Sequence, residues 1–369
     1  MKVTVVGAGI FGLCTALELS NRGHEVELIE REAIPNPESS SFDLHRLIRH
    51  AYGAQHGYAA LIPDAFRAWD ALWQHLGVSY YLETGALVIG ESNHAWITQS
   101  IQSLKDLGIP FEMLSKPQVE GRLPWMHAYK EDQFLFTTKG GILRASSILE
   151  AIAGQLRKQG CTLHVHTEIN RCDFQNGVVY DDKGTRYGGD RLVFALGKGH
   201  SMLLPNELQV FRQVTSLHDN TPFGATVEDA CPMVLDISDD HGFYYVPGSS
   251  HFPAKMGDHS TKFATSATAL PNPTQAEKEN LATVSAYRIR DAALWPVSKW
   301  QLCHYACTED RTLQFRQKDK ALFLFGGSGH GFKFGALFGE LMCSAVEGSL
   351  GTDYVSDLIS GKRSISNTF

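Results

Sequence analysis

The residues with the clearest potential for chemistry are basic side chains set in apolar or glycine-rich stretches. Arg46 and Arg49 stand three residues apart in the run RLIRHAYG (46–53), and Lys255 lies in an otherwise apolar, Gly/Pro-rich stretch. Arginine can hold a planar carboxylate through paired hydrogen bonds, and a buried lysine would stabilise negative charge that develops on a reacting group. The alternatives are a solvated arginine pair on one face of a helix and an exposed edge-strand lysine. From these residues alone, both interpretations stay open.

A second candidate is the run CHYACTED (303–310), in which two cysteines stand four residues apart with a histidine between them. On a strand, Cys303 and Cys307 face one way and His304 the other, so they would chelate a metal poorly. The seven cysteines are scattered and form no CxxC pair. We therefore expect no metal site and no disulfide framework, and the simplest interpretation is reduced, mostly buried thiols.

The chain opens on a glycine motif between two apolar, β-type runs. Gly7, Gly9 and Gly12 follow the run KVTVV (2–6), and a helical pattern and a second strand lead to Glu30, 18 residues after Gly12. In such a unit the glycines allow a tight turn, close approach of a pyrophosphate and close packing of the helix on the strand. The acid accepts hydrogen bonds from a ribose. The sequence therefore predicts a dinucleotide site.

Two later segments favour FAD over NAD as the dinucleotide. The run RLVFALG (191–197) reads as a buried strand that ends at Gly197, and GGSGHGFKF (326–334) is a glycine-rich turn that leads into a helix. A helix N-terminus pointed at the pyrimidine end of a flavin would stabilise the charge gained on reduction. A mere helix-capping loop is the alternative for the second segment.

The elements that must position these residues alternate along the chain. Apolar spacing predicts helices over 58–76, 146–158, 275–291 and about 334–347, and strand-like runs over 85–90, 161–165, 216–236, 243–270 and 321–325. We therefore expect an α/β (α+β) fold in which a Rossmann-like FAD-binding domain (1–80, 140–215 and 295–369) is interleaved with a mixed-sheet substrate domain (81–139 and 216–294).

Composition narrows the function classes. The 369 residues suggest about two domains, and 33 basic against 40 acidic residues give a net charge of −7. This balance disfavours a nucleic-acid partner or a polybasic membrane binder. Apolar runs such as 321–325 are far shorter than a membrane span, and neither a signal peptide nor a peroxisomal ending is evident. We expect a cytoplasmic protein without a membrane partner.

Four segments together resemble the D-amino-acid-oxidase-type flavoproteins, closest to the monomeric sarcosine oxidase and N-methyltryptophan oxidase group. They are RLIRHAYG (46–53), the stretch 243–259 with the spacing of Tyr244, Lys255 and His259, the pattern C-x-Y-x-x-T-x-D at 303–310, and GGSGHGFKF (326–334) with its string GHGFK. The resemblance runs from Met1 to about Gly348. One departure is Phe42, which stands where the group has a histidine near the flavin.

The resemblance implies roles for individual residues. FAD would be bound covalently through Cys303, Arg46 would lie beside the flavin, and Arg49 with Lys333 would hold the substrate carboxylate. Lys255 would activate oxygen, with Tyr244 and His259 as active-site wall and substrate contacts. The cofactor contacts implied are Gly7, Gly9, Ile10, Gly12, Glu30, Arg31, Arg46, Val165, Gly197, Cys303, Gly329, Gly331 and Lys333.

The activity implied is oxidation of the C–N bond of an amino acid with one carboxylate. The substrate would be a secondary amino acid, N-methyl or cyclic, and the products an imine and hydrogen peroxide, with molecular oxygen as the second substrate and a monomer as the active form. The alternatives are a flavin dehydrogenase that passes electrons to a quinone or protein acceptor, an oxidase of a primary amino acid such as glycine or a D-amino acid, and a flavin-carrying binding protein without turnover.

Overall fold

The first layer of the fold is a six-stranded sheet built from both ends and the middle of the chain. The computed structural model describes residues 1–203, 206–258, 263–265 and 272–365. The strand order is β20-β21-β13-β1-β2-β9, parallel except for the β20–β21 pair. These strands are β1 (Lys2–Val6), β2 (Glu25–Ile29), β9 (Thr162–His164), β13 (Arg191–Phe194), β20 (Gln314–Lys318) and β21 (Ala321–Phe325).

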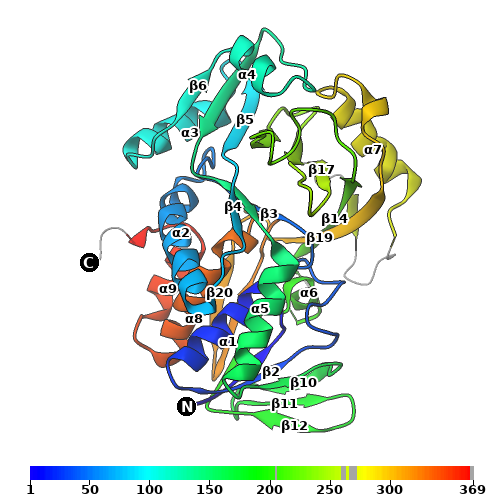
Figure 1. Ribbon diagram of the computed structural model, residues 1–369. Helices are drawn as coiled ribbons and strands as arrows, with labels where there is room; N and C mark the ends of the chain where they lie inside the picture. Colours follow the sequence, from blue (N-terminus) through cyan, green and yellow to red (C-terminus); the bar gives the residue numbers. More distant parts are fainter. Residues whose placement is uncertain (204–205, 259–262, 266–271, 366–369) are drawn as a thin grey trace.

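Short β-branched and aromatic runs form this sheet because both of its faces are covered. Val3, Val5 and Val193 pack with helices α1 (Ile10–Asn21), α2 (His56–Leu76), α5 (Ala145–Lys158) and α8 (Gly335–Glu347). Val6 and Phe194 contribute to a separate core on the opposite face. Helix α1 lies beside α5 and α8 in the lower half of Figure 1. Alternate residues of these strands thus face two different cores, so the sheet that carries the glycine motif is packed on both faces.

The second layer is a nine-stranded mixed sheet in the upper half of Figure 1. Its order is β18-β14-β17-β16-β15-β5-β7-β6, with β19 paired to β14. The strands are β5 (Ala86–Glu91), β6 (Glu112–Leu114), β7 (Asp132–Thr137), β14 (Gln209–His218), β15 (Met233–Asp236), β16 (Phe243–Val246), β17 (Ala254–Asp258), β18 (Phe263–Thr265) and β19 (Lys299–Cys307). The end of strand β19 contacts the glycine-rich turn after β21, where the N–H of Ser328 donates to the carbonyl oxygen of Ala306 at 3.0 Å.

Two small sheets complete the strands. One has the order β10-β11-β12, from β10 (Ile169–Asp173), β11 (Val178–Asp181) and β12 (Arg186–Gly188), and the other is β3-β8-β4, from β3 (Arg46–Ile48), β8 (Gly141–Leu143) and β4 (Tyr81–Glu83). Strand β3 corrects the helical interpretation of the two arginines. Residues 46–48 pair antiparallel with β8, so Arg46 and Arg49 are not on one helix face.

The remaining helices are α3 (Ala95–Asp106), α4 (Lys116–Arg122), α6 (His200–Leu203), α7 (Gln275–Ala286) and α9 (Thr352–Ile359), with 3-10 turns η1 (Gly197–Gly199), η2 (Ala292–Leu294) and η3 (Phe332–Phe334). The four helices expected from apolar spacing are present, although α7 ends at Ala286 rather than near 291. The α/β class is confirmed. The division into two interleaved domains stays a prediction, and β14 with β19, which it assigned largely to the FAD-binding part, pair within the nine-stranded sheet.

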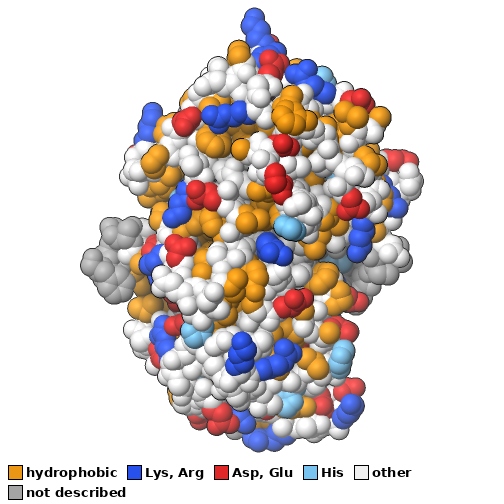
Figure 2. All heavy atoms as spheres, viewed as in Figure 1, with side chains coloured by type: hydrophobic (Ala, Val, Ile, Leu, Met, Phe, Trp, Pro, Cys, Tyr) orange, Lys and Arg blue, Asp and Glu red, His pale blue; other side chains and the backbone are white. Residues whose placement is uncertain are grey.

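The surface carries mixed charge. Figure 2 shows lysine and arginine side chains interspersed with aspartate and glutamate on the face in view. Among the described residues, no helix has both the length and the apolar character that a bilayer crossing requires.

Candidate active site

A cavity of about 570 Å³ lies at the carboxyl ends of β1 and β13. In parallel α/β sheets, ligands bind at this edge because helix N-termini converge there. Predicted cofactor contacts that line the cavity are Gly7, Gly9, Ile10, Glu30, Arg31, Arg46, Gly197, Gly329 and Gly331. The sequence motifs far apart in the chain thus meet at one cavity.

The glycine motif at the cavity wall leaves no room for side chains. Gly7 has φ +101°, and a Cβ there would lie 2.5 Å from the carbonyl oxygen of Ala195. A Cβ at Gly12 would lie 1.8 Å from the carbonyl oxygen of Gly7, so this glycine lets α1 start directly against the turn. The start of α1 therefore faces the cavity with bare backbone, as a bound pyrophosphate requires.

Glu30 directly follows β2, and its carboxylate is already oriented. Its oxygens accept hydrogen bonds from the backbone N–H of Ala8 at 2.8 Å and from Nδ2 of Asn36 at 2.9 Å. The carboxylate is buried and lies on the cavity wall. A carboxylate oxygen accepts more than one hydrogen bond, so this position suits a ribose diol.

The other predicted cofactor contacts lie off the cavity wall. Gly12 packs α1 against the turn behind it, and Val165 is 37% exposed. Cys303 and Lys333 are near the cavity through their neighbours, since His304, Tyr305 and Phe332 line it. Cys303 contacts one group of buried charged residues, and Lys333 belongs to another.

The first group, which we call the Asp43 cluster, consists of Asp43, His45, Arg46 and Lys255. Lys255 lies on β17 and is 2% exposed. Its Nζ donates to Oδ2 of Asp43 at 2.8 Å and to the carbonyl of His45 at 2.8 Å, and Nη1 of Arg46 donates to the same Oδ2. Burial would raise the pKa of Asp43, but Lys255 and Arg46 hold it well below its ordinary value. The cluster is a fixed, internally paired set of charges.

Cys303 is attached to this cluster. Nη2 of Arg46 donates to its Sγ at 3.4 Å, and Sγ lies 4.0 Å from the carbonyl oxygen of Ser40. Burial raises the pKa of the thiol, while Arg46 acts in the opposite direction because a cation favours the thiolate. Cys303 and His304 are consecutive residues of strand β19 and therefore face opposite sides of it, as expected. Cys303 and Cys307 are both free thiols.

The second group, the Tyr52 cluster, consists of Arg49, Tyr52 and Lys333. Cζ of Arg49 lies 5.0 Å and Nζ of Lys333 5.4 Å from the centre of the Tyr52 ring. Burial lowers the pKa of Arg49, and burial together with Arg49 lowers the pKa of Lys333 well below its ordinary value. Among the described residues, Nη1 of Arg49 has no hydrogen-bond partner, and neither cation has an acidic one. The cluster is therefore a ready site for an anion.

Aromatic side chains border both clusters. The Tyr244 ring lies over Gly257 of the neighbouring strand, where a Cβ would come within 2.4 Å of it, and its centre is 5.7 Å from Nζ of Lys255. Trp96 of α3 lies 5.4 Å from Cζ of Arg49. The predicted contact His259 lies outside the described residues.

Sequence reasoning missed three polar residues at this site. Asp43 and His45 lie three and one residues before Arg46, and His304 lines the cavity with an Nε2 that has no partner among the described residues. The only signal for Asp43 was an acid three residues before an arginine, which is too common to be informative. For the two histidines, no spacing pattern distinguishes a cavity position from a core position.

The site fits FAD on structural grounds, since bare backbone, a carboxylate for a ribose and a glycine-rich turn surround one cavity. Residues 2–345 match the sequence model of the FAD-dependent oxidoreductases that include D-amino-acid oxidase. The chain belongs to this family. The resemblance found in the sequence is thus confirmed, and FAD is the cofactor that the family implies.

Characterised relatives of this FAD-dependent oxidoreductase are distant but cover its length. Monomeric sarcosine oxidase of Bacillus sp. (strain B-0618) is 22% identical over 353 residues, which is 92% of this chain and 90% of that protein. N-methyl-L-tryptophan oxidase of Yersinia pestis (strain Pestoides F) is 23% identical over 344 residues, with 91% and 92% covered.

Solved structures share the fold. NikD, described as an unusual amino acid oxidase essential for nikkomycin biosynthesis, superposes with a TM-score of 0.82 at 18% identity, covering 95% of this chain and 94% of that one. L-proline dehydrogenase from P. horikoshii gives 0.81 at 18% identity with the same coverage. At these identities the likeness establishes the fold alone.

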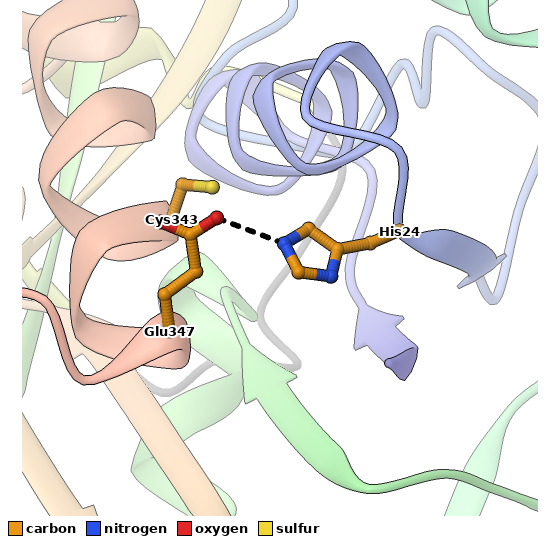
Figure 3. Close-up of side chains that lie close together, drawn as sticks. All are labelled: His24, Cys343 and Glu347. Atoms are coloured by element: carbon orange, nitrogen blue, oxygen red, sulfur yellow. Dashed lines mark hydrogen bonds and ion pairs between the residues drawn. The ribbon is translucent and has the colours of Figure 1, made fainter.

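A separate cluster of His24, Cys343 and Glu347 lies between the end of α8 and the start of β2 (Figure 3). Nε2 of His24 lies 3.0 Å from Oε1 of Glu347, and Nη1 of Arg22 lies 2.8 Å from Oε2. Burial raises the pKa of the Cys343 thiol to about 12. With an arginine on the carboxylate and a protonated thiol, the group acts as an ion-pair network that ties α8 to β2.

Proposed function

We propose that this protein is an FAD-dependent oxidase that oxidises the C–N bond of an amino acid with one carboxylate, a secondary amino acid in particular. The observation that carries the proposal is the Tyr52 cluster. Two buried cations, Arg49 and Lys333, face one aromatic ring without an acidic partner among the described residues. Burying charge without a partner is costly, so a ligand carboxylate is the natural partner.

Bound FAD supplies the two-electron oxidation, and the chain's residues supply position and charge. Arg49 offers a planar set of donors and Lys333 a point charge, and together they would fix the substrate carboxylate. This fixes the position of the substrate's amine relative to the flavin, which contributes much of a rate enhancement. The two curated relatives act, by their names, on sarcosine and N-methyl-L-tryptophan, which supports an N-methyl amino acid among the secondary ones.

Molecular oxygen is the proposed electron acceptor, and Lys255 is the residue proposed to serve it. A buried cation that keeps its proton stabilises negative charge on oxygen. Lys255 donates to Asp43 and to the carbonyl of His45, so its ammonium group has a set direction. The products are an imine, which water hydrolyses, and hydrogen peroxide.

A covalent bond between Cys303 and the flavin is part of the proposal. The Arg46 guanidinium lies 3.4 Å from Sγ and favours the thiolate, which is the reactive form of cysteine. We expect wild-type protein to retain yellow colour in an acid-precipitated pellet and the Cys303→Ala variant to lose it. Colour retained by Cys303→Ala would overturn the assignment. The matched control is Cys307→Ala, since Cys307 lies two residues beyond Tyr305 on the same strand.

The deciding experiment for the activity is a peroxide assay with matched pairs of amines. N-methyl and cyclic amino acids are compared with the same amines lacking the carboxylate, and with primary and D-amino acids. We expect peroxide from secondary amino acids and little from their decarboxylated counterparts. Anaerobic bleaching without aerobic peroxide would instead assign a dehydrogenase, which a quinone acceptor would reveal. No bleaching by any amino acid would leave a binding protein.

A further inference from the structure

Asp43 is a buried carboxylate that the proposed function does not use. Only 5% of its side chain is exposed, and its two oxygens are fully engaged. Oδ2 accepts from Nζ of Lys255 at 2.8 Å and from Nη1 of Arg46, and Oδ1 accepts from the backbone N–H of Leu44 at 2.7 Å. One carboxylate thus joins two cations that come from different sheets.

The backbone of Asp43 is itself held by helix α5. The carbonyl oxygen of Asp43 accepts from Oγ of Ser146 at 2.7 Å and from the N–H of Ser146 at 2.9 Å, and the N–H of Ala145 donates to the carbonyl of Leu44 at 3.1 Å. The first turn of α5 therefore fixes the loop, because N–H groups at a helix start seek acceptors. The carboxylate has little freedom to move away from its cations.

With Lys255 protonated, the charges in the Asp43 cluster sum to one positive charge. Burial lowers the pKa of Lys255, and Asp43 acts against that shift. Lys255 and Arg46 contribute two and Asp43 removes one, while His45 stays neutral, since burial and Lys255 lower its pKa to about 3. The other titratable groups that act on the cluster are Tyr244 from β16, Cys303 and Tyr305 from β19, and Arg144 before α5. Burial raises the pKa of both tyrosines and of the thiol, so all three are neutral near pH 7.

We propose that Asp43 is a positioning residue that holds Lys255 and Arg46 as one unit of net charge +1 beside the flavin. The inference rests on the proposed function, because it assigns Lys255 and Arg46 to the flavin. It goes further in stating that the charge beside the flavin is set by an acid, and that this acid raises the pH at which Lys255 loses its proton. Lys255 and Arg46 both reach the same oxygen of Asp43, so without the acid their positive charges would repel each other.

A charge-balance series with sulfite tests this directly. Sulfite adds to oxidised flavin and leaves negative charge on the ring, so nearby positive charge tightens its binding. At pH 6 the cluster carries +1 in the wild type, +2 in Asp43→Asn, 0 in Lys255→Met and +1 in the double variant. We expect Asp43→Asn to bind sulfite most tightly, Lys255→Met most weakly by about tenfold, and the double variant to return to the wild-type Kd.

The matched control is Asp236→Asn. Asp236 is also a fully buried acid on an arginine, Nε of Arg288 at 2.5 Å, but it belongs to a separate ion pair of β15. Its loss should lower the Tm as a loss of Asp43 does and leave the sulfite Kd unchanged. A double variant that binds sulfite no better than Lys255→Met would overturn the proposal. This comparison remains available if Asp43→Asn alone fails to fold, because the double variant leaves no lysine without its acid.

The pH dependence gives a second readout. Flavin reduced with dithionite is mixed with oxygen, and the reoxidation rate is followed between pH 6 and 10. We expect the fall in rate as Lys255 loses its proton to move about one to three pH units lower in Asp43→Asn, and Asp43→Glu to restore most of the wild-type profile. Superimposed profiles for wild type and Asp43→Asn would contradict the role of Asp43.

Neither readout needs an amino-acid substrate. If no amino acid bleaches the flavin but the sulfite series follows the charge balance, the proposed activity fails and the role of Asp43 stands. If amino acids are oxidised but the sulfite series is flat, the activity stands and the role of Asp43 fails.

Discussion

Two pairs of buried cations lie near the FAD cavity, and they differ in what neutralises them. Lys255 and Arg46 share the carboxylate of Asp43, whereas Arg49 and Lys333 share the ring of Tyr52 and no acidic group among the described residues. A pair with its own acid is complete before any ligand arrives. In the second pair, Nζ of Lys333 donates to the carbonyl oxygen of His330 at 3.2 Å, but the positive charge is neutralised only when a ligand brings the negative charge.

The chain separates the two pairs with a very short strand. Arg46 begins β3, which ends at Ile48, and Arg49 follows it. On extended backbone, residues three apart point to opposite sides, so each arginine joins a different lysine. The same spacing on a helix would have placed the two arginines on one face, where their charges would repel each other.

The largest effect is expected where the ligand must supply the acid. Arg49→Met or Lys333→Met should lower kcat/KM for an amino acid by about 10³-fold, because loss of one partner from a buried ion pair costs about 3–5 kcal/mol. Steady-state rates of peroxide formation measure this. Arg122→Met is the matched control, since Arg122 also lies over an aromatic ring, Phe136 at 5.3 Å, but is exposed. An effect below tenfold at Arg49 would place the substrate carboxylate elsewhere.

A smaller and more selective effect is expected in the paired cluster. Lys255→Met should slow the reaction of reduced flavin with oxygen by about 10²-fold and leave anaerobic reduction by substrate within a few-fold of wild type. Stopped-flow measurement of each half-reaction distinguishes them. Comparable losses in both half-reactions would mean that Lys255 serves substrate binding, and the contrast between the two clusters would then be wrong.

Much of this architecture could be predicted from local pattern. The glycine motif, Glu30 and the helices over 56–76, 145–158 and 335–347 follow from turn chemistry and apolar spacing. The resemblance to the flavoprotein family, which short motifs carry, implied the roles predicted for Cys303, Arg49 and Lys333. These signals are local, because each depends on neighbours in the chain.

The pairing of charges could not be predicted in the same way. Asp43 and Lys255 are 212 residues apart, and their contact depends on how the nine-stranded sheet lies against the loop before β3. The helical interpretation of Arg46 and Arg49 failed because a spacing of three suits a helix, whereas pairing with β8 imposes a strand. Tertiary pairing overrides local preference most easily in segments as short as this one.

Proton uptake should sharpen the comparison further. Burial and Arg49 hold the pKa of Lys333 well below its ordinary value, and a bound carboxylate would raise it again. Binding of acetate at pH 8 should therefore take up as much as one proton. Calorimetry in two buffers with different ionisation enthalpies measures it. Lys333→Met should lose the uptake and Lys255→Met should keep it, and uptake that persists in Lys333→Met would assign the proton to another group.

The smallest effect concerns one histidine beside each cluster. His45 and His50 are buried, and neither ring nitrogen of either has a partner among the described residues. Burial, assisted by Lys255 for His45 and by Lys139 for His50, lowers their pKa values to about 3 and about 4. Each is neutral in the folded state and takes up a proton near pH 6.5 only when unfolded, so the stability is complete above pH 6.5 and is lost as the pH falls.

As the pH falls from 7.5 to 5, protonation of each histidine in the unfolded state should therefore lower the free energy of unfolding by about 2 kcal/mol. Urea unfolding of His45→Gln and His50→Gln measures it, because each variant should lose less stability over this interval than the wild type. The two variants should behave alike down to about pH 4, since burial alone accounts for most of the shift at both sites. A larger effect at His45 above pH 5 would mean that the positive charge of the Asp43 cluster, rather than burial, controls its protonation.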